Sequence, residues 1–467
     1  MWNYLGNYGL KSPSSGRLGP RPNLSRLAIA LLSALIFLEL ILMVLGLISR
    51  RQARPEAGPP AITTVMARPA GGQPELAKKE LVSLIGARSL GDSQEVLPVI
   101  DRQGRRLFVR STLRPELQAR CETLISNSRA SQAALVALDP ESGEVLALAG
   151  YREGGLDRQA ALAGSFPAAS LFKIVTAAAA VEKAELSADS KLAYDGGKHT
   201  LYKNNVARTP DRGRQTATLQ ESFAESINTV FGKLGAFVGP EDLADFAGRF
   251  GFNQDIDFEM PVEASSFSID ETDNFHLAEL ASGFNRQTRM SPLHAALMAA
   301  AVVAGGSLPE PRIVREVFDR ENRIYYQSAP GQAREVISPA TAEELARLMR
   351  SAVEEGTGRK VIGAAVRSHP VLSRLIVGGK SGTINDEEGR RVDWFVAWAT
   401  PRPGAGCRDK IALSAVLIHN GLTTTTSQKM IREALAAYYR GRLTPPRKQA
   451  AAPKSALATT RTVGYTH

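Results

Sequence analysis

The segment Ser170-Leu-Phe-Lys173 stands at the start of KIVTAAAAVE, an alanine-rich stretch whose composition predicts a helix. A serine and a lysine three positions apart lie on one face of a helix, so the Lys173 amine can reach the Ser170 hydroxyl. A hydroxyl is a weak nucleophile at its own pKa, and a lysine that is partly shielded from water can remove its proton. The pattern therefore indicates acyl transfer, although a helix cap followed by a solvated lysine would look the same.

Two further short motifs follow, and each of the three occurs once in the chain. Ser226-Ile-Asn228 lies within LQESFAESINTVFGKLGAF, which predicts one long helix, and Lys380-Ser-Gly-Thr383 follows the apolar run Leu375-Ile-Val377. Any one of these motifs is a weak signal. The combination S-x-x-K, S-x-N and K-[ST]-G in this order is typical of serine β-lactamases and penicillin-binding proteins.

Composition and charge exclude several other classes of protein. Of the 467 residues 43% are apolar, which is enough for a folded core. Two cysteines, Cys121 and Cys407, are too few for a disulfide framework or a cysteine-rich zinc module, and we expect both thiols to be unpaired. The net charge of +10 divides into +6 for residues 1–54, +5 for residues 441–467 and −1 for residues 55–440. We expect no nucleic-acid partner, because the folded part carries no excess of basic residues. We also expect no metal, because the six scattered histidines include no HExxH pair, and no cofactor.

Residues 27–48 predict a membrane anchor. They read LAIALLSALIFLELILMVLGLI and are interrupted only by Ser33 and Glu39. A helix of this length covers roughly 33 Å, enough to cross the hydrocarbon core of a bilayer. The run is longer than the apolar part of a signal peptide, and Ser-Arg-Arg follows it, so we expect an uncleaved single-pass anchor. Residues 1–26 are then cytoplasmic, and residues 49–100 form a juxtamembrane linker or short pedestal.

Predicted strands lie at both ends of residues 101–440, with helices between them. The segment ALVALDPESGEVLALAG predicts a hairpin around Asp139-Pro-Glu-Ser-Gly143, and late strands are predicted in VGGKSGT, DWFVAWAT and IALSAVLIH. RPELQARCETLISNS predicts an amphipathic helix that buries Leu117, Cys121 and Leu124. This order predicts an α+β domain whose sheet is closed by distant segments, followed by a disordered basic tail over residues 441–467.

Residues from about 100 to 440 resemble the transpeptidase domain of a penicillin-binding protein. Beyond the three motifs, Glu355-Gly-Thr-Gly358 resembles a turn of that family, and SPLHAALMAAAVVAGG resembles the helix after its substrate-site loop. The resemblance implies a five-stranded antiparallel-type sheet flanked by helices, an all-helical subdomain, and an active site between the two. It also implies peptidoglycan stem peptides as substrates, penicillin and other β-lactams as inhibitors, and a domain held outside the plasma (inner) membrane of a bacterium.

The resemblance assigns a catalytic role to four residues. Ser170 attacks the penultimate D-Ala carbonyl of a stem peptide and forms an acyl-serine intermediate. Lys173 takes the proton of Ser170, Ser226 relays a proton to the departing amine, and Lys380 supplies positive potential for the terminal carboxylate of the substrate. The acyl group then passes to an amine on a neighbouring stem, which forms a cross-link, or to water.

Four further residues are assigned to substrate binding by the same resemblance. Asn228 orients the general base and the substrate amide, and the hydroxyls of Ser381 and Thr383 hold the terminal carboxylate. Gly382 has no side chain, so the acyl peptide can lie against the strand and extend the sheet. Backbone N–H groups of Ser170 and Thr383 form the oxyanion hole.

Three alternatives stay open at this point. With water as the acceptor the enzyme is a D,D-carboxypeptidase. A β-lactamase or β-lactam sensor shares the fold, but no E-x-x-x-N pattern lies between the second and third motifs to activate a deacylating water. A non-catalytic scaffold of the cell-wall synthesis machinery need not keep all three motifs intact. Only about 50 to 80 residues separate the anchor from the domain, too few for a glycosyltransferase domain, so a separate glycosyltransferase is a candidate partner.

Overall fold

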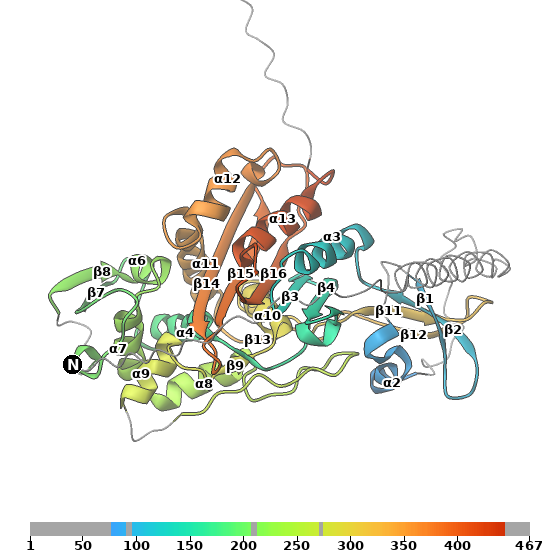
Figure 1. The fold of residues 1–467 in the computed structure, drawn as a ribbon, viewed down its shortest axis with the longest axis horizontal. Coiled ribbons are helices and arrows are strands. Elements are labelled where there is room, and N and C mark those ends of the chain that lie inside the picture. Colours follow the sequence, from blue (N-terminus) through green and yellow to red (C-terminus); the bar gives the residue numbers. More distant parts are fainter. Residues whose placement is uncertain (1–75, 90–95, 207–212, 270–273, 444–467) are drawn as a thin grey trace, which may run out of the picture. The chain divides into compact units, whose positions relative to one another are not determined.

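A sheet of six strands lies at the centre of the molecule (Figure 1). The computed structural model describes residues 76–89, 96–206, 213–269 and 274–443, all of which belong to one structural unit, Met66–His467. The predicted cytoplasmic segment, membrane anchor and most of the linker and basic tail lie outside the described residues. Within the described part of the chain, no helix has the length and apolar character that crossing a membrane requires.

The central sheet joins the predicted hairpin to three strands from the last quarter of the chain. Every neighbouring pair is antiparallel, in the order β14-β15-β16-β3-β4-β5. The expected closure by distant segments is therefore confirmed, but a sixth strand of two residues, β5, extends the five that were expected. The strands are β14 (Leu375–Asn385), β15 (Arg391–Pro401), β16 (Ile411–Ile418), β3 (Gln132–Leu138), β4 (Val145–Arg152) and β5 (Gly155–Leu156).

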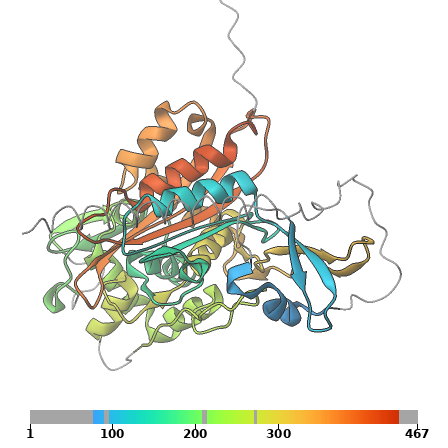
Figure 2. The same cartoon turned by 45° about the vertical axis from the view of Figure 1, so that its right-hand side comes forward.

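Helices cover both faces of this sheet, as Figure 2 shows. The side chains of a strand alternate between the two faces, so Leu413 and Leu417 of β16 pack against α3 (Pro115–Ser126) and α13 (Ser427–Tyr439). Ala412 and Val416 face the opposite way, towards α10 (Pro292–Val303). This explains why β16 is apolar at nearly every position.

Helix α3 buries a slightly different stripe from the predicted one. Leu117 and Cys121 are buried as expected, but Ile125 is the third buried apolar residue, and Leu124 is only half-buried. Positions 117, 118, 121 and 125 form the buried face, and position 124 lies at its edge, where Leu124 packs partly exposed against the same cluster. Both Cys121 and Cys407 are free thiols, as expected.

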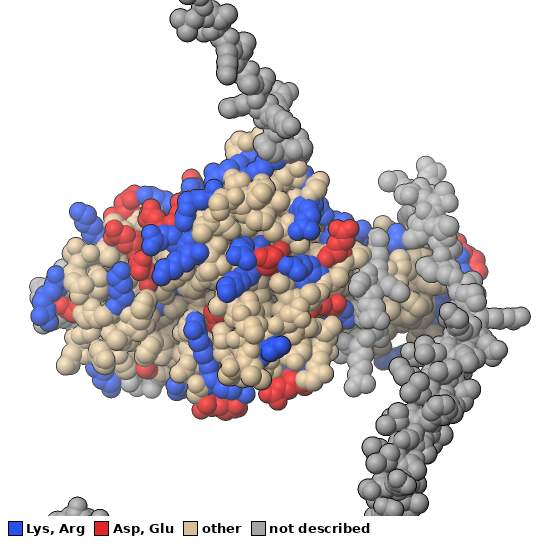
Figure 3. Space-filling view, turned by 45° about the horizontal axis from the view of Figure 1, so that its top comes forward, with Lys and Arg blue, Asp and Glu red and all other residues tan. Residues whose placement is uncertain are grey.

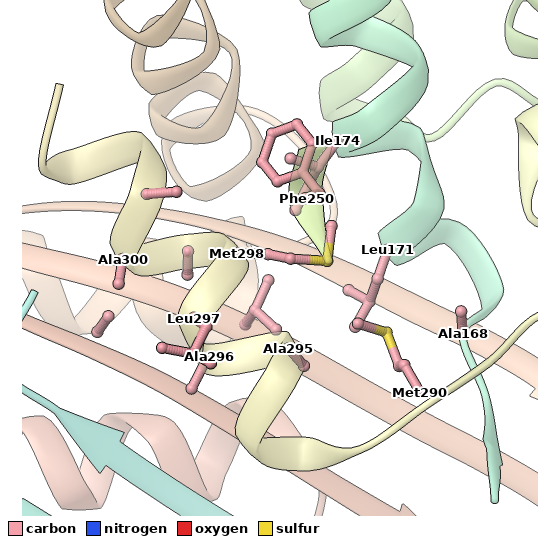
Figure 4. Close-up of a cluster of buried hydrophobic side chains, with 14 of the residues drawn as sticks. Ala168, Leu171, Ile174, Phe250, Met290, Ala295, Ala296, Leu297, Met298 and Ala300 are labelled. Carbon is pink, nitrogen blue, oxygen red and sulfur yellow. The ribbon is translucent and has the colours of Figure 1, made fainter. Parts of the chain in front are cut away.

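The core beneath α10 also supports the segment that carries Ser170. Figure 4 shows Leu171 beside Met290 and Ile174 beside Phe250, in one apolar cluster with the side chains of α10. Leu171 and Ile174 are almost completely buried. Ala168, which precedes Ser170, is buried in the same cluster, so apolar contacts on both sides of Ser170 in the sequence fix the position of its backbone.

A second sheet has the order β1-β2-β11-β12. In it, β2 from the start of the domain pairs with β11, which follows α10 in the sequence. Helix α2 (Lys78–Ser89) packs with it through Leu81 and Ile85, both fully buried, and Lys78 forms ion pairs with Asp257 and Glu310. Residues 76–100 of the expected linker or pedestal thus contain a helix and a strand, and that strand, β1, pairs with β2, which lies after residue 100. The strands are β1 (Val96–Ile100), β2 (Arg106–Ser111), β11 (Val314–Phe318) and β12 (Ile324–Gln327).

The second subdomain is mainly helical but not all-helical as predicted. A two-stranded ribbon of β7 and β8 lies in it, next to α6 (Figure 1). The residues between the two strands are mostly polar and include several glycines, and such residues favour a ribbon over a packed helix. The subdomain and neighbouring elements are α4 (Lys173–Lys183), β7 (Lys191–Tyr194), α5 (Lys203–Val206), β8 (Gln215–Thr218), α6 (Leu219–Ala224), α7 (Asn228–Val238), α8 (Pro240–Phe250), α9 (Asn274–Ser282), α11 (Pro339–Glu354) and α12 (Ala364–Ser368). Short paired strands are β6 (Phe166–Pro167) with β9 (Arg289–Met290) and β10 (Ser307–Leu308) with β13 (Arg334–Glu335).

The surface carries charges of both signs. On the face seen in Figure 3, lysine and arginine side chains are interspersed with aspartate and glutamate. Exposed ion pairs of the described residues include Arg347 with Asp189 and Arg350 with Glu354. Exposed pairs of this kind add little to stability, roughly 0–1 kcal/mol each, but they agree with the nearly neutral charge of residues 55–440.

Candidate active site

The first motif lies on a tight turn that leads directly into α4. Ser170 is part of a 3₁₀ helix, Ala169–Phe172, and the α-helix begins only at Lys173. Lys173 Nζ lies 2.8 Å from Ser170 Oγ, so the predicted contact between the two side chains is present. Ala169, just before the serine, has a φ of 50°, an unusual value for a residue with a side chain.

Close packing around Gly283 explains part of this geometry. A Cβ atom on Gly283 would lie 1.9 Å from the carbonyl oxygen of Ala169, and Gly283 itself has a φ of 66°. Only glycine can follow this path without a steric clash. The residue before it, Ser282, uses its carbonyl oxygen to accept a hydrogen bond from Lys173 Nζ. The last residue of α9 thus also holds the amine of Lys173.

Lys173 is completely buried, which makes it unusual among lysines. Its amine also bonds to Asn228 Oδ1 at 2.8 Å, so each of its three named partners is a neutral oxygen. Burial lowers the pKa of Lys173 well below its ordinary value, and the nearby charge of Lys380 lowers this pKa further. Among the described residues no carboxylate forms an ion pair with Lys173, so its neutral form is favoured.

The second motif lies at a break between two helices, which corrects the prediction of one long helix. Helix α6 ends at Ala224 and α7 begins at Asn228, and between them Ser226 has a φ of 57°. The break is stabilised by Asn228, whose backbone N–H donates to Lys198 O at 2.7 Å and whose side-chain amide donates to His199 O at 2.9 Å. A continuous helix would leave both of these bonds unmade. The left-handed residue turns the Ser226 side chain towards β14.

The third motif lies on β14, the edge strand of the central sheet. Lys380 is fully buried, and its Nζ atom donates to Ser226 Oγ at 2.9 Å and to the carbonyl oxygen of Ser381 at 3.0 Å. Burial lowers the pKa of Lys380 to about 7. The ring of Phe223 lies 5.4 Å from the amine and provides a weak cation–π contact.

The next residues of β14 are arranged around the same space. Gly382 faces Ala169, where an added Cβ would approach the Ala169 Cβ atom to 3.3 Å. Thr383 is exposed, and Ser381 is half-buried. The structure thus brings the three motifs together, linking Ser170, Lys173 and Asn228 by hydrogen bonds, and Ser226 with Lys380. The predicted convergence of far-apart segments is found.

Thr357 is a residue whose contribution sequence reasoning did not identify. It belongs to the turn Glu355-Gly-Thr-Gly358, and its Oγ1 atom accepts a hydrogen bond from Ser381 Oγ at 2.8 Å. Its backbone N–H donates to Ala224 O, and its backbone oxygen accepts from Gln428. The turn resembled one of the family, but no sequence signal linked its threonine to β14. The role of Ser282 was also missed, because a backbone carbonyl leaves no signature in the sequence.

The described residues offer no group of three or more histidine, cysteine, aspartate or glutamate side chains that could hold a metal ion. The titratable groups at the centre of the site are two buried lysines, of which Lys173 favours its neutral form. This arrangement suits a serine nucleophile activated by an amine and a substrate with negative charge.

Comparison with known proteins identifies the family. Residues 133–408, which are 276 of the 467 residues, match the family described as penicillin binding protein transpeptidase domain. The chain belongs to the penicillin-binding protein transpeptidase family. All three motifs lie within the matched part of this penicillin-binding domain.

Curated relatives match the penicillin-binding domain at low identity. The chain is 24% identical over 310 residues to stage V sporulation protein D of Bacillus subtilis, covering 64% of this chain and 47% of that protein. It is 25% identical over 354 residues to the peptidoglycan D,D-transpeptidase PbpA of Mycolicibacterium smegmatis, covering 67% of each. The chain spans about half the length of several of these relatives.

Solved structures confirm the fold of the penicillin-binding domain. The crystal structure of PBPA from Mycobacterium tuberculosis superposes with a TM-score of 0.58 at 22% identity, covering 72% of this chain and 83% of that one. A D,D-transpeptidase domain from Eggerthella lenta superposes with a TM-score of 0.57 at 20% identity, covering 74% and 95%. The predicted fold of an antiparallel sheet flanked by helices is therefore confirmed.

Proposed function

We propose that this protein is a peptidoglycan D,D-transpeptidase. The observation that carries the proposal is the 2.8 Å contact between Lys173 Nζ and Ser170 Oγ in a buried site where the amine has no carboxylate partner among the described residues. The family supports it, since one matched relative is itself named a peptidoglycan D,D-transpeptidase. A related M. tuberculosis protein has been crystallised as an acyl-enzyme with penicillin G.

In the first step Ser170 Oγ attacks the carbonyl carbon of the penultimate D-Ala, and the neutral amine of Lys173 accepts the hydroxyl proton. The lowered pKa of Lys173 keeps this amine unprotonated in more molecules at neutral pH. The carbonyl oxygen becomes negative and is bound by the backbone N–H groups of Ser170 and Thr383. A donor of this kind lowers the barrier by about 3 kcal/mol.

In the second step the bond between the two D-Ala residues breaks. The departing amine takes a proton from Ser226 Oγ, and the Lys380 ammonium, 2.9 Å away, stabilises the oxygen that has lost it. The proton that Lys173 accepted restores the Ser226 hydroxyl. The products are free D-Ala and an ester between Ser170 and the stem peptide.

The ester is resolved by an amine of a neighbouring stem peptide. The amine attacks the ester carbonyl, gives up one proton to the side-chain base, and Ser170 leaves as its hydroxyl. With water as the attacking group the same chemistry gives a D,D-carboxypeptidase. A β-lactamase would need an efficient base for that water, and the described hydrogen-bond partners of Ser170 and Lys173 include no carboxylate.

The terminal carboxylate of the substrate is assigned to the end of the site formed by Lys380, Ser381 and Thr383. The ammonium of Lys380 provides attraction, and the two hydroxyls provide hydrogen bonds. β-Lactams carry a carboxylate at the corresponding place relative to their reactive carbonyl. The same residues would therefore bind penicillin and peptide donors alike.

The proposal includes a location and a partner. Residues 27–48 would anchor the chain in the bacterial plasma membrane as a single span, with the penicillin-binding domain on the extracytoplasmic side, where peptidoglycan lies. The length and apolar character of this segment support the anchor. Cross-linking needs polymerised glycan strands, and a separate glycosyltransferase would supply them.

The test is covalent labelling of the full chain in detergent by a fluorescent penicillin. Wild-type protein should form an adduct that survives denaturation, and Ser170→Ala should form none while it keeps the wild-type melting temperature. Folded wild-type protein that stays unlabelled would refute the enzyme and favour a scaffold. Labelling with turnover within seconds would indicate a β-lactamase. Lipid II polymerised by an added glycosyltransferase then shows whether cross-links or only free D-Ala are formed.

A further inference from the structure

Two basic side chains cap carbonyl groups on the free edge of β14. Lys380 Nζ donates to Ser381 O at 3.0 Å, and Arg286 Nε donates to Asn385 O at 2.8 Å. Among the strands that the structure describes, β14 pairs with β15 on one side and with none on the other. Backbone groups of every second residue point to the same edge of a strand. Thr383 lies midway between the two capped residues and therefore presents its N–H and C=O to the same edge.

This arrangement leaves a short stretch of free strand edge with a basic side chain at each end. An added strand can pair with Thr383, but it meets Lys380 at one end and Arg286 at the other. The distance between residues two apart in a strand is about 6.6–6.8 Å. A group two positions away from the residue that pairs with Thr383 thus lies beside Asn385, whose carbonyl oxygen accepts from Arg286.

Arg286 is available to such a group. Its side chain is exposed, and among the described residues it forms no ion pair with a carboxylate. Its Nε atom is the one that caps Asn385, which leaves the two terminal nitrogens of the guanidinium for another partner. Arg289, three residues further on, is different, since its guanidinium lies 2.6 Å from Glu387 on the turn between β14 and β15.

The direction of the substrate follows from the proposed function. The terminal carboxylate lies at the Lys380 end, and the penultimate D-Ala pairs with Thr383. The preceding residues of the stem must then run past Asn385 towards Arg286. Two carboxylates can occur there: the α-carboxylate of a γ-linked glutamate at the second position, and the side-chain carboxylate of a diamino dicarboxylic acid at the third. Each becomes a neutral carboxamide when the stem is amidated.

We propose that Arg286 is a specificity-determining residue that selects stem peptides with a free carboxylate upstream of the scissile bond. The inference rests on the proposed function and adds a substrate class to it. A guanidinium forms paired, charge-assisted hydrogen bonds with a carboxylate and cannot do so with a carboxamide. The Nε contact to Asn385 restrains the guanidinium beside the free edge of β14 and leaves its two terminal nitrogens for a carboxylate.

The test compares four synthetic donor peptides that are free or amidated at the second and third positions. The full chain in detergent is given each donor with a D-amino acid as acceptor, and the release of D-Ala gives kcat/KM. We expect the wild type to prefer the carboxylate donor over the doubly amidated donor by roughly tenfold, a typical value for one charge-assisted pair. The singly amidated donors identify which carboxylate is bound.

Variants separate this role from a structural one. Arg286→Gln should reduce the preference to less than twofold, and Arg286→Lys should keep part of it because the charge remains. Arg289→Gln is the matched control and should keep the full preference. An equal preference in wild type and Arg286→Gln, or no preference in the wild type, would overturn the inference. If Arg286→Gln fails to fold, the wild type is tested in 0.5 M salt. Loss of its preference for the carboxylate donor then supports the inference, and a preference that does not depend on salt refutes the inference.

The two proposals fail in different ways. Labelling of Ser170 by a fluorescent penicillin tests the proposed function and needs no upstream carboxylate. Labelled protein that treats all four peptides alike would leave the transpeptidase standing and remove the role of Arg286.

Discussion

Lys380 Nζ donates a hydrogen bond to Ser226 Oγ at 2.9 Å, across 154 positions of sequence. The bond joins the edge strand of the sheet to the break between two helices, so it connects the two halves of the site. A buried amine and a hydroxyl held in this way can pass a proton and also attract an anion. Which of these roles dominates at a given pH depends on whether Lys380 is charged.

The pH dependence of the acylation rate should reveal whether Lys380 is charged. Burial lowers the pKa of Lys380 to about 7, so in the free enzyme its ammonium is lost as the pH rises through that value. The second-order rate constant for a carboxylate-bearing β-lactam should therefore fall above pH 7, although the lowered pKa of Lys173 favours the reaction as the pH rises. Stopped-flow labelling from pH 5 to 10 measures this rate constant. In Lys380→Arg, whose side chain stays charged, the decline of the rate constant at high pH should disappear. A decline that persists in this variant would be caused by a group other than Lys380.

Replacing Ser226 should slow the chemistry without unfolding the protein. Ser226→Ala removes the hydroxyl that contacts Lys380, and loss of a positioned proton-transfer group lowers the rate by roughly 10²–10⁴-fold. The backbone at position 226 should keep its left-handed conformation with either serine or alanine, so the melting temperature should change by only a few degrees. Single-turnover acylation by penicillin and thermal unfolding provide the two measurements. An unchanged rate would remove Ser226 from the proton path.

Thr357 should affect substrate binding more than catalysis. Thr357→Val keeps the shape of the side chain but removes the oxygen that accepts from Ser381 Oγ. Ser381 then lacks a fixed orientation, and KM for a carboxylate substrate should rise by about 3- to 10-fold, as expected for loss of one hydrogen bond, with kcat within a factor of two. Thr357→Ser restores the oxygen and is the control. Equal behaviour of the valine and serine variants would show that the hydroxyl has no role.

Gly283 and Gly305 provide a matched pair of backbone tests. Their φ angles are 66° and 70°, so alanine meets the same conformational strain at both positions, roughly 1–2 kcal/mol. A Cβ on Gly283 would in addition clash with Ala169 O at 1.9 Å, whereas Gly305 has open space around it. We expect Gly305→Ala to lower the free energy of unfolding modestly and to keep penicillin labelling. Gly283→Ala should be clearly less stable than Gly305→Ala and should lose penicillin labelling. Similar stability and labelling in the two variants would show that the clash with Ala169 does not occur.

The parts of the fold that the sequence predicted are those with strong local patterns. The hairpin at residues 134–150 and strands β14 to β16 were predicted because apolar runs and turn residues mark them. The order of the three motifs was enough to predict that Ser170, Ser226 and Lys380 converge. These features depend on residue type and spacing, which the sequence shows directly.

The parts that were missed depend on tertiary contacts. The helix break at Ser226 exists because Asn228 bonds to the backbone of Lys198 and His199, and helical propensity cannot anticipate these partners. Ile125 replaced Leu124 in the core because packing selected the face of α3. Thr357 and Ser282 act through one hydroxyl and one backbone carbonyl, and neither leaves a pattern that spacing alone could identify.

The antiparallel pairing of β3 with β16 has a consequence for biosynthesis. Residue 170 leaves the ribosome some 200 positions before β14 to β16 have been made, so the nascent chain carries its serine long before Lys380 exists. Until β16 arrives, β3 and β4 are an isolated ribbon, which is at best marginally stable in water. Such long-range closure is slow compared with local helix formation. We therefore expect the Ser170 hydroxyl to be unreactive during translation, until nearly the whole domain has been synthesised.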